Sequence, residues 1–259
     1  MLIGPRPSAR RLRFARRASL RRAAYLLGEF RYEQPDPARF YGAIARDTAD
    51  LVVDVCADLD IPTDGALLLD VGGGPGYFAE ALAEVGIRYI SVEPDPTEMH
   101  AAGIDARGSI RGSGTALPIR SGAVDICLSS NVAEHVADPW TMAEEMLRVT
   151  RPGGVVILSY TMFYGPFGGH ETGPWHFLGG EYAARRYARI HGHEPKNRFG
   201  RSLFPITATA GLRWAAGTAA GEPVAAFPRY HPRWAWWIVR VPLLRELLTS
   251  NLVLVLRAR

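Results

Sequence analysis

The chain has 259 residues, of which 47% are hydrophobic and 22% charged, a composition typical of a globular domain with a large buried core. It contains no run of about 18 apolar residues, and no apolar segment follows the first arginines, so neither a transmembrane helix nor a secretory signal peptide is expected. The cysteines, Cys56 and Cys127, are far apart and outside any CxxC pair, which argues against a disulfide framework or a zinc site built on them. Together these features favour the reducing cytoplasm.

The net charge of +4 is concentrated at the N-terminus. Eight arginines lie between Arg6 and Arg22, and no acidic residue occurs before Glu29. We therefore expect residues 1–35 to form a basic N-terminal arm that is partly disordered. Such an arm can bind nucleic acid or an anionic membrane surface. Base-stacking aromatic residues are nearly absent from it, which favours a solvated leader, so a nucleic-acid partner is not expected.

From residue 36 the hydrophobic pattern predicts alternating helices and strands in one domain, 36–259. Asp36 and Pro37 suit the start of a helix that runs to about Asp60. Apolar runs of the buried-strand type, with helical patterns between them, imply a parallel sheet covered on both faces. The expected strands are 66–71, 88–92, a weak one near Ile110, 124–129, 155–160, 224–227 and 252–256; the expected helices are 77–85, 138–150 and 207–216.

The most informative segment is LLLDVGGGPGYF, residues 67–78. A strand ends at Asp70, and Gly72, Gly74 and Gly76 follow at alternate positions before a helix. Glycines there allow positive φ angles and let backbone N–H groups approach a ligand at the helix N-terminus. The dinucleotide fingerprint G-x-G-x-x-G requires a third glycine at position 77, which is tyrosine. An acid just before the turn also suits a ligand with an ammonium group better than a pyrophosphate.

This D-x-G-x-G-x-G segment resembles motif I of the class I S-adenosylmethionine-dependent methyltransferases. The resemblance implies a Rossmann-like fold, with a mostly parallel seven-stranded sheet, helices on both faces and an insertion after the fifth strand. It implies S-adenosyl-L-methionine as the cofactor and S-adenosyl-L-homocysteine as its product. Glu93, at the end of the second strand, matches the acid with which the family binds the ribose hydroxyls, and a carboxylate that accepts two hydroxyl hydrogen bonds suits this role.

Two further segments fit the same family. RGSGTALPIR is similar to its adenine-contacting loop, although Ser113 stands where the family usually has an aspartate; Ser113, Gly114 and Thr115 are the adenine-contacting candidates. Asn131, after the strand at 124–129, lies where the family contacts the methionine half. The chain also resembles a group of uncharacterised actinobacterial methyltransferases in RYEQPDPARFYG, SSNVAEHV, GPFGGHE and PRYHPRWAWW, which supports the class and names no substrate.

The acceptor site is less clear from sequence. An oxygen acceptor needs a general base, for which histidine is the usual residue. His135 follows the strand at 124–129, and His170 and His176 lie in a glycine- and aromatic-rich insertion, 161–205; these three are the catalytic candidates, and each could instead be structural. His170, Glu171 and His176 do not have the spacing of a helical metal motif, so no metal ion is predicted. Tyr160, Tyr164, Trp175 and Phe177 could line an acceptor pocket or form the insertion's own core.

These features favour a methyltransferase that modifies oxygen on a small-molecule, saccharide or glycolipid acceptor. The alternatives are a C- or N-methyltransferase of an aromatic or quinone-like metabolite, and an inactive methyltransferase-fold module that binds RNA or protein. A second insertion, 229–250, is apolar and rich in tryptophan and arginine. This composition is typical of a segment at a membrane surface and is also compatible with core or subunit packing. A cytoplasmic protein, peripheral at the inner face of the membrane in the first case, is expected, with its oligomeric state open.

Overall fold

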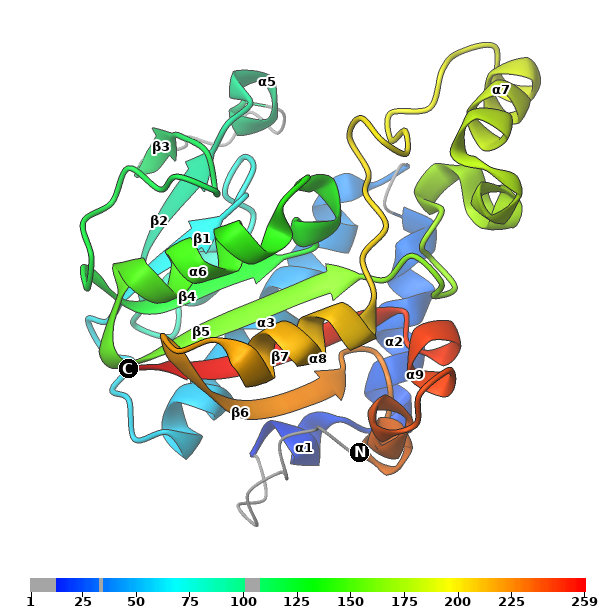
Figure 1. Cartoon of the computed structure of the whole chain (residues 1–259). Helices are drawn as coiled ribbons and strands as arrows, with labels where there is room; N and C mark the ends of the chain where they lie inside the picture. Colours follow the sequence, from blue (N-terminus) through cyan, green and yellow to red (C-terminus); the bar gives the residue numbers. More distant parts are fainter. Residues whose placement is uncertain (1–12, 33–34, 101–107) are drawn as a thin grey trace.

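A computed structural model describes residues 13–32, 35–100 and 108–259. Their strands form one seven-stranded sheet in the order β3-β2-β1-β4-β5-β7-β6 (Figure 1). All neighbours are parallel except β7, which runs antiparallel to both β5 and β6. The Rossmann-like fold expected from the sequence is confirmed. The strands are β1 (Leu67–Val71), β2 (Arg88–Glu93), β3 (Ser109–Arg111), β4 (Val124–Ser130), β5 (Thr150–Thr161), β6 (Gly221–Pro228) and β7 (Asn251–Ala258).

Helices cover both faces of the sheet. In Figure 1, α6 (Pro139–Val149) and α8 (Ala208–Gly217) lie in front, and α3 (Pro37–Asp58) lies behind. Successive residues of β1 supply the two cores, because side chains alternate along a strand. Leu68 packs with α3, while Leu69 packs with α6, and both are fully buried. The shorter helices α4 (Ala79–Ala83) and α5 (Pro96–Met99) flank β2.

The strand order changes direction between β1 and β4, which are neighbours at the centre of the sheet. In open α/β sheets, ligands bind beyond the carboxyl ends of the strands at such a point. The fold therefore places the glycine turn after β1 and the residues after β4 side by side.

The N-terminal arginines require a correction to the expected arm. Residues 14–32 form α1 (Phe14–Arg17), α2 (Leu20–Glu29) and a short 3-10 turn η1 (Phe30–Tyr32), and Phe14 and Leu26 are buried. The reason is an acidic stripe on α3, where aspartates recur every three or four residues. Arg13, Arg17 and Arg22 form ion pairs with this stripe, which consists of Asp47, Asp50, Asp54 and Asp58. Residues 13–32 thus belong to the folded domain, while residues 1–12 lie outside the described residues.

The insertion after β5 contains an ordered element that the sequence pattern did not predict. A 3-10 segment, η3 (His170–Leu178), is followed by the twelve-residue helix α7 (Gly180–His191), which projects from the body of the molecule at upper right in Figure 1. Between β6 and β7, the Trp-rich segment forms η4 (Arg233–Arg240) and α9 (Leu244–Leu248). None of the helices in the described part of the chain is long and apolar enough to cross a membrane.

Candidate active site

The glycine turn leaves β1 with a backbone that only glycine adopts easily. Gly72, Gly74 and Gly76 have φ angles of 77°, 52° and 89°, in the left-handed region that side chains disfavour. A Cβ on Gly72 would lie 2.5 Å from the side chain of Val132, whereas one on Gly74 would meet nothing within 4 Å. The turn is therefore packed against its neighbours at Gly72 and open at Gly74, as a ligand cradle requires.

Two buried carboxyl groups flank this turn. The Asp70 carboxylate accepts a hydrogen bond from the Tyr89 hydroxyl at 2.8 Å, and burial raises its pKa to about 7. The Glu93 carboxylate accepts from the backbone N–H groups of Gly74, at 3.2 Å, and Asp95, at 3.1 Å. Burial also raises the pKa of Glu93. Glu93 therefore connects the end of β2 directly to the open part of the glycine turn.

The segments after β3 and β4 complete this edge. Ser113 and Thr115 are joined through their hydroxyl groups at 2.9 Å. A Cβ on Gly114 would lie 3.1 Å from the side chain of Val71, so this loop packs against the end of β1. Asn131 has a φ of 58°, and its Oδ1 accepts from Asn251 Nδ2 at 2.6 Å. All the cofactor candidates chosen from the sequence thus lie at or just after the carboxyl ends of β1, β2, β3 or β4, at the same edge of the sheet.

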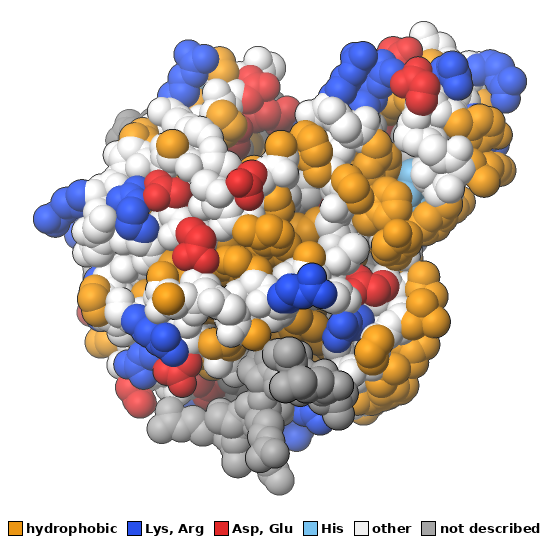
Figure 2. Space-filling view, in the orientation of Figure 1, with side chains coloured by type: hydrophobic (Ala, Val, Ile, Leu, Met, Phe, Trp, Pro, Cys, Tyr) orange, Lys and Arg blue, Asp and Glu red, His pale blue; other side chains and the backbone are white. Residues whose placement is uncertain are grey.

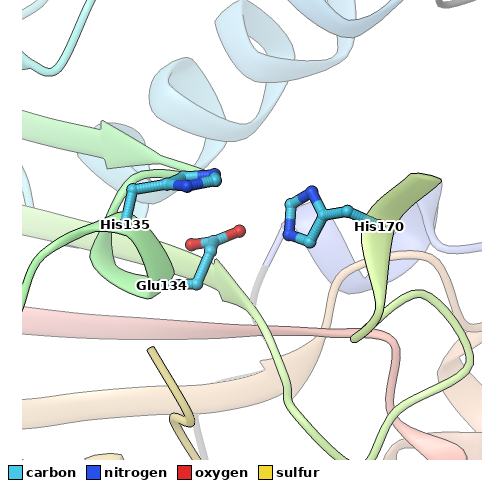
Figure 3. Close-up of side chains that lie close together, drawn as sticks. All are labelled: Glu134, His135 and His170. Carbon is cyan, nitrogen blue, oxygen red and sulfur yellow. The ribbon is translucent and has the colours of Figure 1, made fainter. Parts of the chain in front are cut away.

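Beside this edge lies a cluster of one carboxylate and two imidazoles. Glu134 and His135 belong to a 3-10 turn, η2 (Ala133–His135), directly after β4, while His170 begins η3 in the insertion. One carboxylate oxygen of Glu134 and one ring nitrogen of each histidine all lie within 4.8 Å of one another. The centroids of the two imidazole rings are 5.1 Å apart. Figure 3 shows the three side chains pointing toward one another, Glu134 and His135 from one side and His170 from the other.

Backbone groups orient two members of this cluster. Glu134 Oε1 accepts from the Thr161 N–H at 3.0 Å, and His135 Nδ1 lies 2.6 Å from the carbonyl oxygen of Ser202. Because a carbonyl can only accept, Nδ1 of His135 carries a proton, and in the neutral ring the lone pair is then on Nε2. Glu134 Oε2 and His170 Nε2 are buried and have no hydrogen-bond partner in the part of the chain that the structure describes. Burial raises the pKa of Glu134 and lowers that of His170 to about 4.

Comparisons with known proteins show the family to which the chain belongs. A family model described as "Methyltransferase domain" matches residues 69–158. An "Uncharacterized methyltransferase" of Mycobacterium marinum is 64% identical over 252 residues, covering 95% of this chain and 98% of that protein. A relative with the same description in Mycobacterium leprae is 62% identical over 251 residues, covering 95% and 93%. The chain belongs to the class I S-adenosylmethionine-dependent methyltransferases.

Solved structures support the fold of this methyltransferase. A "SAM-dependent methyltransferase, possible histamine N-methyltransferase" from Thermotoga maritima matches with a TM-score of 0.50 over 91% of this chain and 96% of that one. Its sequence identity is 17%, so this likeness concerns the fold alone.

The residues at the glycine turn fit S-adenosylmethionine. The open backbone at Gly74 admits a ligand, and the buried Glu93 carboxylate beside it suits a diol such as the ribose hydroxyls. The buried Asp70 carboxyl group has a hydroxyl donor and forms no ion pair with any described residue, which suits a ligand that carries an ammonium group. Tyr77, at the position where a dinucleotide turn would have glycine, stacks on Tyr41 of α3 with ring centroids 4.0 Å apart.

The third histidine chosen from the sequence is not part of the cluster. Both nitrogens of His176 lie 2.8 Å from backbone carbonyls, those of Gly173 and Phe163, and its ring packs in the insertion. Glu171 is also engaged, since it accepts two hydrogen bonds from Asn197. The expected grouping of His170, Glu171 and His176 is therefore corrected: His170 joins the sheet edge, and His176 holds the insertion together.

Two other expectations change in the same region. Tyr160 is fully buried and donates to the carbonyl of Thr207, so it belongs to the core and cannot line an acceptor pocket. Tyr164 and Phe177 stack on each other and remain partly exposed. Sequence reasoning did not choose Glu134 as a site residue. The available signal was its position beside His135 immediately after a strand that ends at the ligand-binding edge.

Proposed function

We propose that this methyltransferase methylates oxygen on a small-molecule, saccharide or glycolipid acceptor. The observation that carries the proposal is the cluster of Glu134, His135 and His170 beside the donor site. Val132, two residues before Glu134, packs against Gly72 of the donor turn, so the two sites adjoin. A hydroxyl group becomes a good nucleophile only when its proton is removed, and this cluster concentrates proton-accepting atoms where the acceptor would lie.

Within the proposal, the donor is held by the edge of the sheet. When bound, S-adenosylmethionine supplies an electrophilic methyl group on a positively charged sulfur. Glu93 binds the ribose hydroxyls, and the glycine turn and Asp70 accept the amino-acid end. The adenine-contacting residues are Ser113, Gly114 and Thr115, and Asn131 contacts the methionine half. With the donor already activated, the residues of the chain chiefly align the acceptor and exclude water.

The reaction then needs one proton acceptor. The acceptor oxygen forms a bond to the methyl carbon, the carbon–sulfur bond breaks, and its electron pair stays on sulfur. The hydroxyl proton leaves at the cluster, where Glu134 Oε2 and His170 Nε2 have no hydrogen-bond partner among the described residues. His135 is oriented for the same duty by the Ser202 carbonyl. Carbon or nitrogen acceptors depend less on such a group, which is why the cluster favours oxygen.

An exposed apolar surface supports a lipid-linked acceptor. Trp234 and Leu243, on η4 and just before α9, are 71% and 70% exposed, although Ala235, Ile238 and Val239 of η4 are buried against the core. Hydrophobic side chains continue along the right-hand edge of the molecule in Figure 2. The arginines at the two ends of η4, Arg233 and Arg240, are exposed. We propose that this face contacts the anionic inner face of the membrane, where tryptophan and arginine together are favourable.

Product analysis tests the acceptor atom. The purified protein is incubated with methyl-labelled S-adenosylmethionine in two separate reactions, one with a soluble extract of a mycobacterium and one with a lipid extract. Labelled product is isolated and the methylated atom assigned by NMR. A methyl ether or ester supports the proposal, and label on carbon or nitrogen refutes it. A Glu93→Ala variant serves as the control that the labelling depends on the donor site.

Vesicle co-sedimentation tests the membrane contact. Binding to vesicles that contain anionic lipid, lost in a Trp234→Ser/Leu243→Ser double variant, is expected. Equal recovery of both proteins with the vesicles would refute the contact without affecting the assignment of the acceptor atom.

A further inference from the structure

We propose that Glu134, His135 and His170 bind a divalent transition-metal cation, with Zn²⁺ or Mn²⁺ the best match to their donor atoms. Two imidazoles and one carboxylate form a recognised three-ligand set for such ions, which leaves further positions open to water or substrate. Among the residues that the structure describes, these three are the histidine, cysteine or acidic side chains whose ligand atoms lie close enough to one another to hold one metal ion. The existence of the site stands on this geometry, and its role in catalysis rests on the proposed function.

The first support is the pair of buried atoms without partners. A buried carboxylate oxygen and a buried imidazole nitrogen each lose hydration on folding, and folded proteins nearly always replace it with a bond. Glu134 Oε2 and His170 Nε2 have none among the described residues. Glu134 and His170 are 36 positions apart in the sequence and are brought together where η2 and η3 meet. One cation bonded to both would replace the lost hydration of the two groups at once.

The second support is the way in which the other atoms are engaged. Metal-binding histidines usually donate their second ring N–H to a carbonyl or carboxylate, which fixes the ring and leaves one lone pair for the metal. His135 has this arrangement through the Ser202 carbonyl at 2.6 Å. Glu134 is held similarly, with Oε1 bound by the Thr161 N–H and Oε2 left for the cation. The carboxylate lies beside both imidazole rings in Figure 3.

The distances require only a small contraction. Metal–ligand bonds of about 2.0–2.2 Å bring ligand atoms to within roughly 3–4.4 Å of one another. The three ligand atoms now lie within 4.8 Å. His170 has a φ of 48°, a left-handed conformation that is uncommon for a histidine. Such backbone is costly and is concentrated at functional sites. A bond between His170 and a metal ion would offset the cost of this conformation and would fix the insertion to the edge of the sheet.

A cation here changes how the acceptor loses its proton. An acceptor hydroxyl that binds an open position on the metal becomes more acidic, because the positive charge stabilises its conjugate base. The proton passes to solvent, and the oxygen then forms its bond to the methyl carbon as the carbon–sulfur bond breaks. In this arrangement the imidazoles hold the metal instead of taking the proton themselves. A pair of neighbouring hydroxyls, as in many saccharides, could occupy two positions at once.

Calorimetry with metal ions tests the site directly. Tag-free protein is treated with a chelator, dialysed, and titrated with Zn²⁺ and separately with Mn²⁺. We expect one bound ion per chain for at least one of the two metals. Affinity for it should fall about 100-fold or more in three variants, Glu134→Gln, His135→Asn and His170→Asn. Gln keeps the acceptor for Thr161, Asn at 135 can still donate to Ser202, and Asn tolerates the left-handed backbone at 170.

A matched control uses histidines outside the cluster. The rings of His191 and His193 lie 6.3 Å apart on the exposed end of α7, where they could bind zinc weakly. The double variant His191→Gln/His193→Gln should keep the bound ion. X-ray absorption at the metal edge of this double variant should report two imidazole ligands, and it needs no change in the cluster itself. Two results would overturn the proposal. One is that the unmodified protein binds neither Zn²⁺ nor Mn²⁺, and the other is that the bound ion is lost in the double variant His191→Gln/His193→Gln.

Titration with S-adenosylhomocysteine separates the two proposals. Each cluster variant should bind it as the unmodified protein does, which shows that the fold is intact. If metal binds at the cluster and the labelled methyl group is found on carbon or nitrogen, the metal site stands and the proposed function fails. If calorimetry detects no bound ion, and the metal-free protein methylates oxygen as well as the untreated protein does, the metal site fails and the proposed function stands.

Discussion

Glu93 offers the sharpest test of how the donor is held. Its carboxylate is buried at the end of β2 and accepts from the Gly74 and Asp95 N–H groups. Replacing it with alanine removes the proposed bonds to the ribose hydroxyls and also releases the glycine turn at Gly74. Hydrogen bonds to a charged group contribute about 1.5–3 kcal/mol. Affinity for S-adenosylhomocysteine should therefore fall about 10- to 150-fold in Glu93→Ala.

The assay is calorimetric titration of both proteins under the same conditions. Glu98→Ala is the matched control, because Glu98 lies on α5, five residues away, and pairs with Lys196 at 2.8 Å on the surface. It loses the same charge without touching the turn, so its affinity should change less than about twofold, as expected for an exposed ion pair. Unchanged affinity in Glu93→Ala would show that the ribose is bound elsewhere. Equal losses in both variants would show that only the net charge matters, and either result refutes the reasoning.

Three further variants test the cradle, the buried acid and the N-terminal helices. Gly74→Ala should cost about 1 kcal/mol of stability, because its φ is 52° with free space around the added methyl; calorimetry should show at least a tenfold loss of S-adenosylhomocysteine affinity, and unchanged affinity would mean that the turn's open side faces no ligand. Asp70→Asn should stabilise the cofactor-free protein progressively as pH rises from about 4 through about 7, because the raised pKa of Asp70 makes its ionisation unfavourable in the folded state. The gain, up to about 4 kcal/mol above pH 7, should vanish near pH 4 in urea unfolding, and a pH-independent difference would contradict it. Arg22→Ala breaks a largely buried two-point ion pair with Asp47 and should cost about 3 kcal/mol. The exposed neighbour Arg21→Ala should change stability by less than about 0.5 kcal/mol, and similar losses in thermal unfolding would contradict the packed N-terminal helices.

The sequence by itself determined the fold class and the donor. Each depends on local pattern, since apolar runs between helical stretches give a parallel sheet, and three alternate glycines after a strand permit one kind of turn. Asp70, Tyr77 and Glu93 then distinguished the donor from a dinucleotide. The positions of these residues are set by the strands that carry them, so their grouping at one edge followed from the pattern alone.

Only the tertiary structure decided which distant residues meet. The sequence pattern of the N-terminal arginines predicts a basic, partly disordered arm. In the folded protein these arginines pair with the acidic stripe of α3. The stripe was present in the sequence at helical spacing, but which segment it faced depends on packing. In the same way His170 was separated from its neighbour in sequence, Glu171, and brought to Glu134 and His135. An insertion has no periodicity that specifies its docking, because its contacts come from the surface on which it folds.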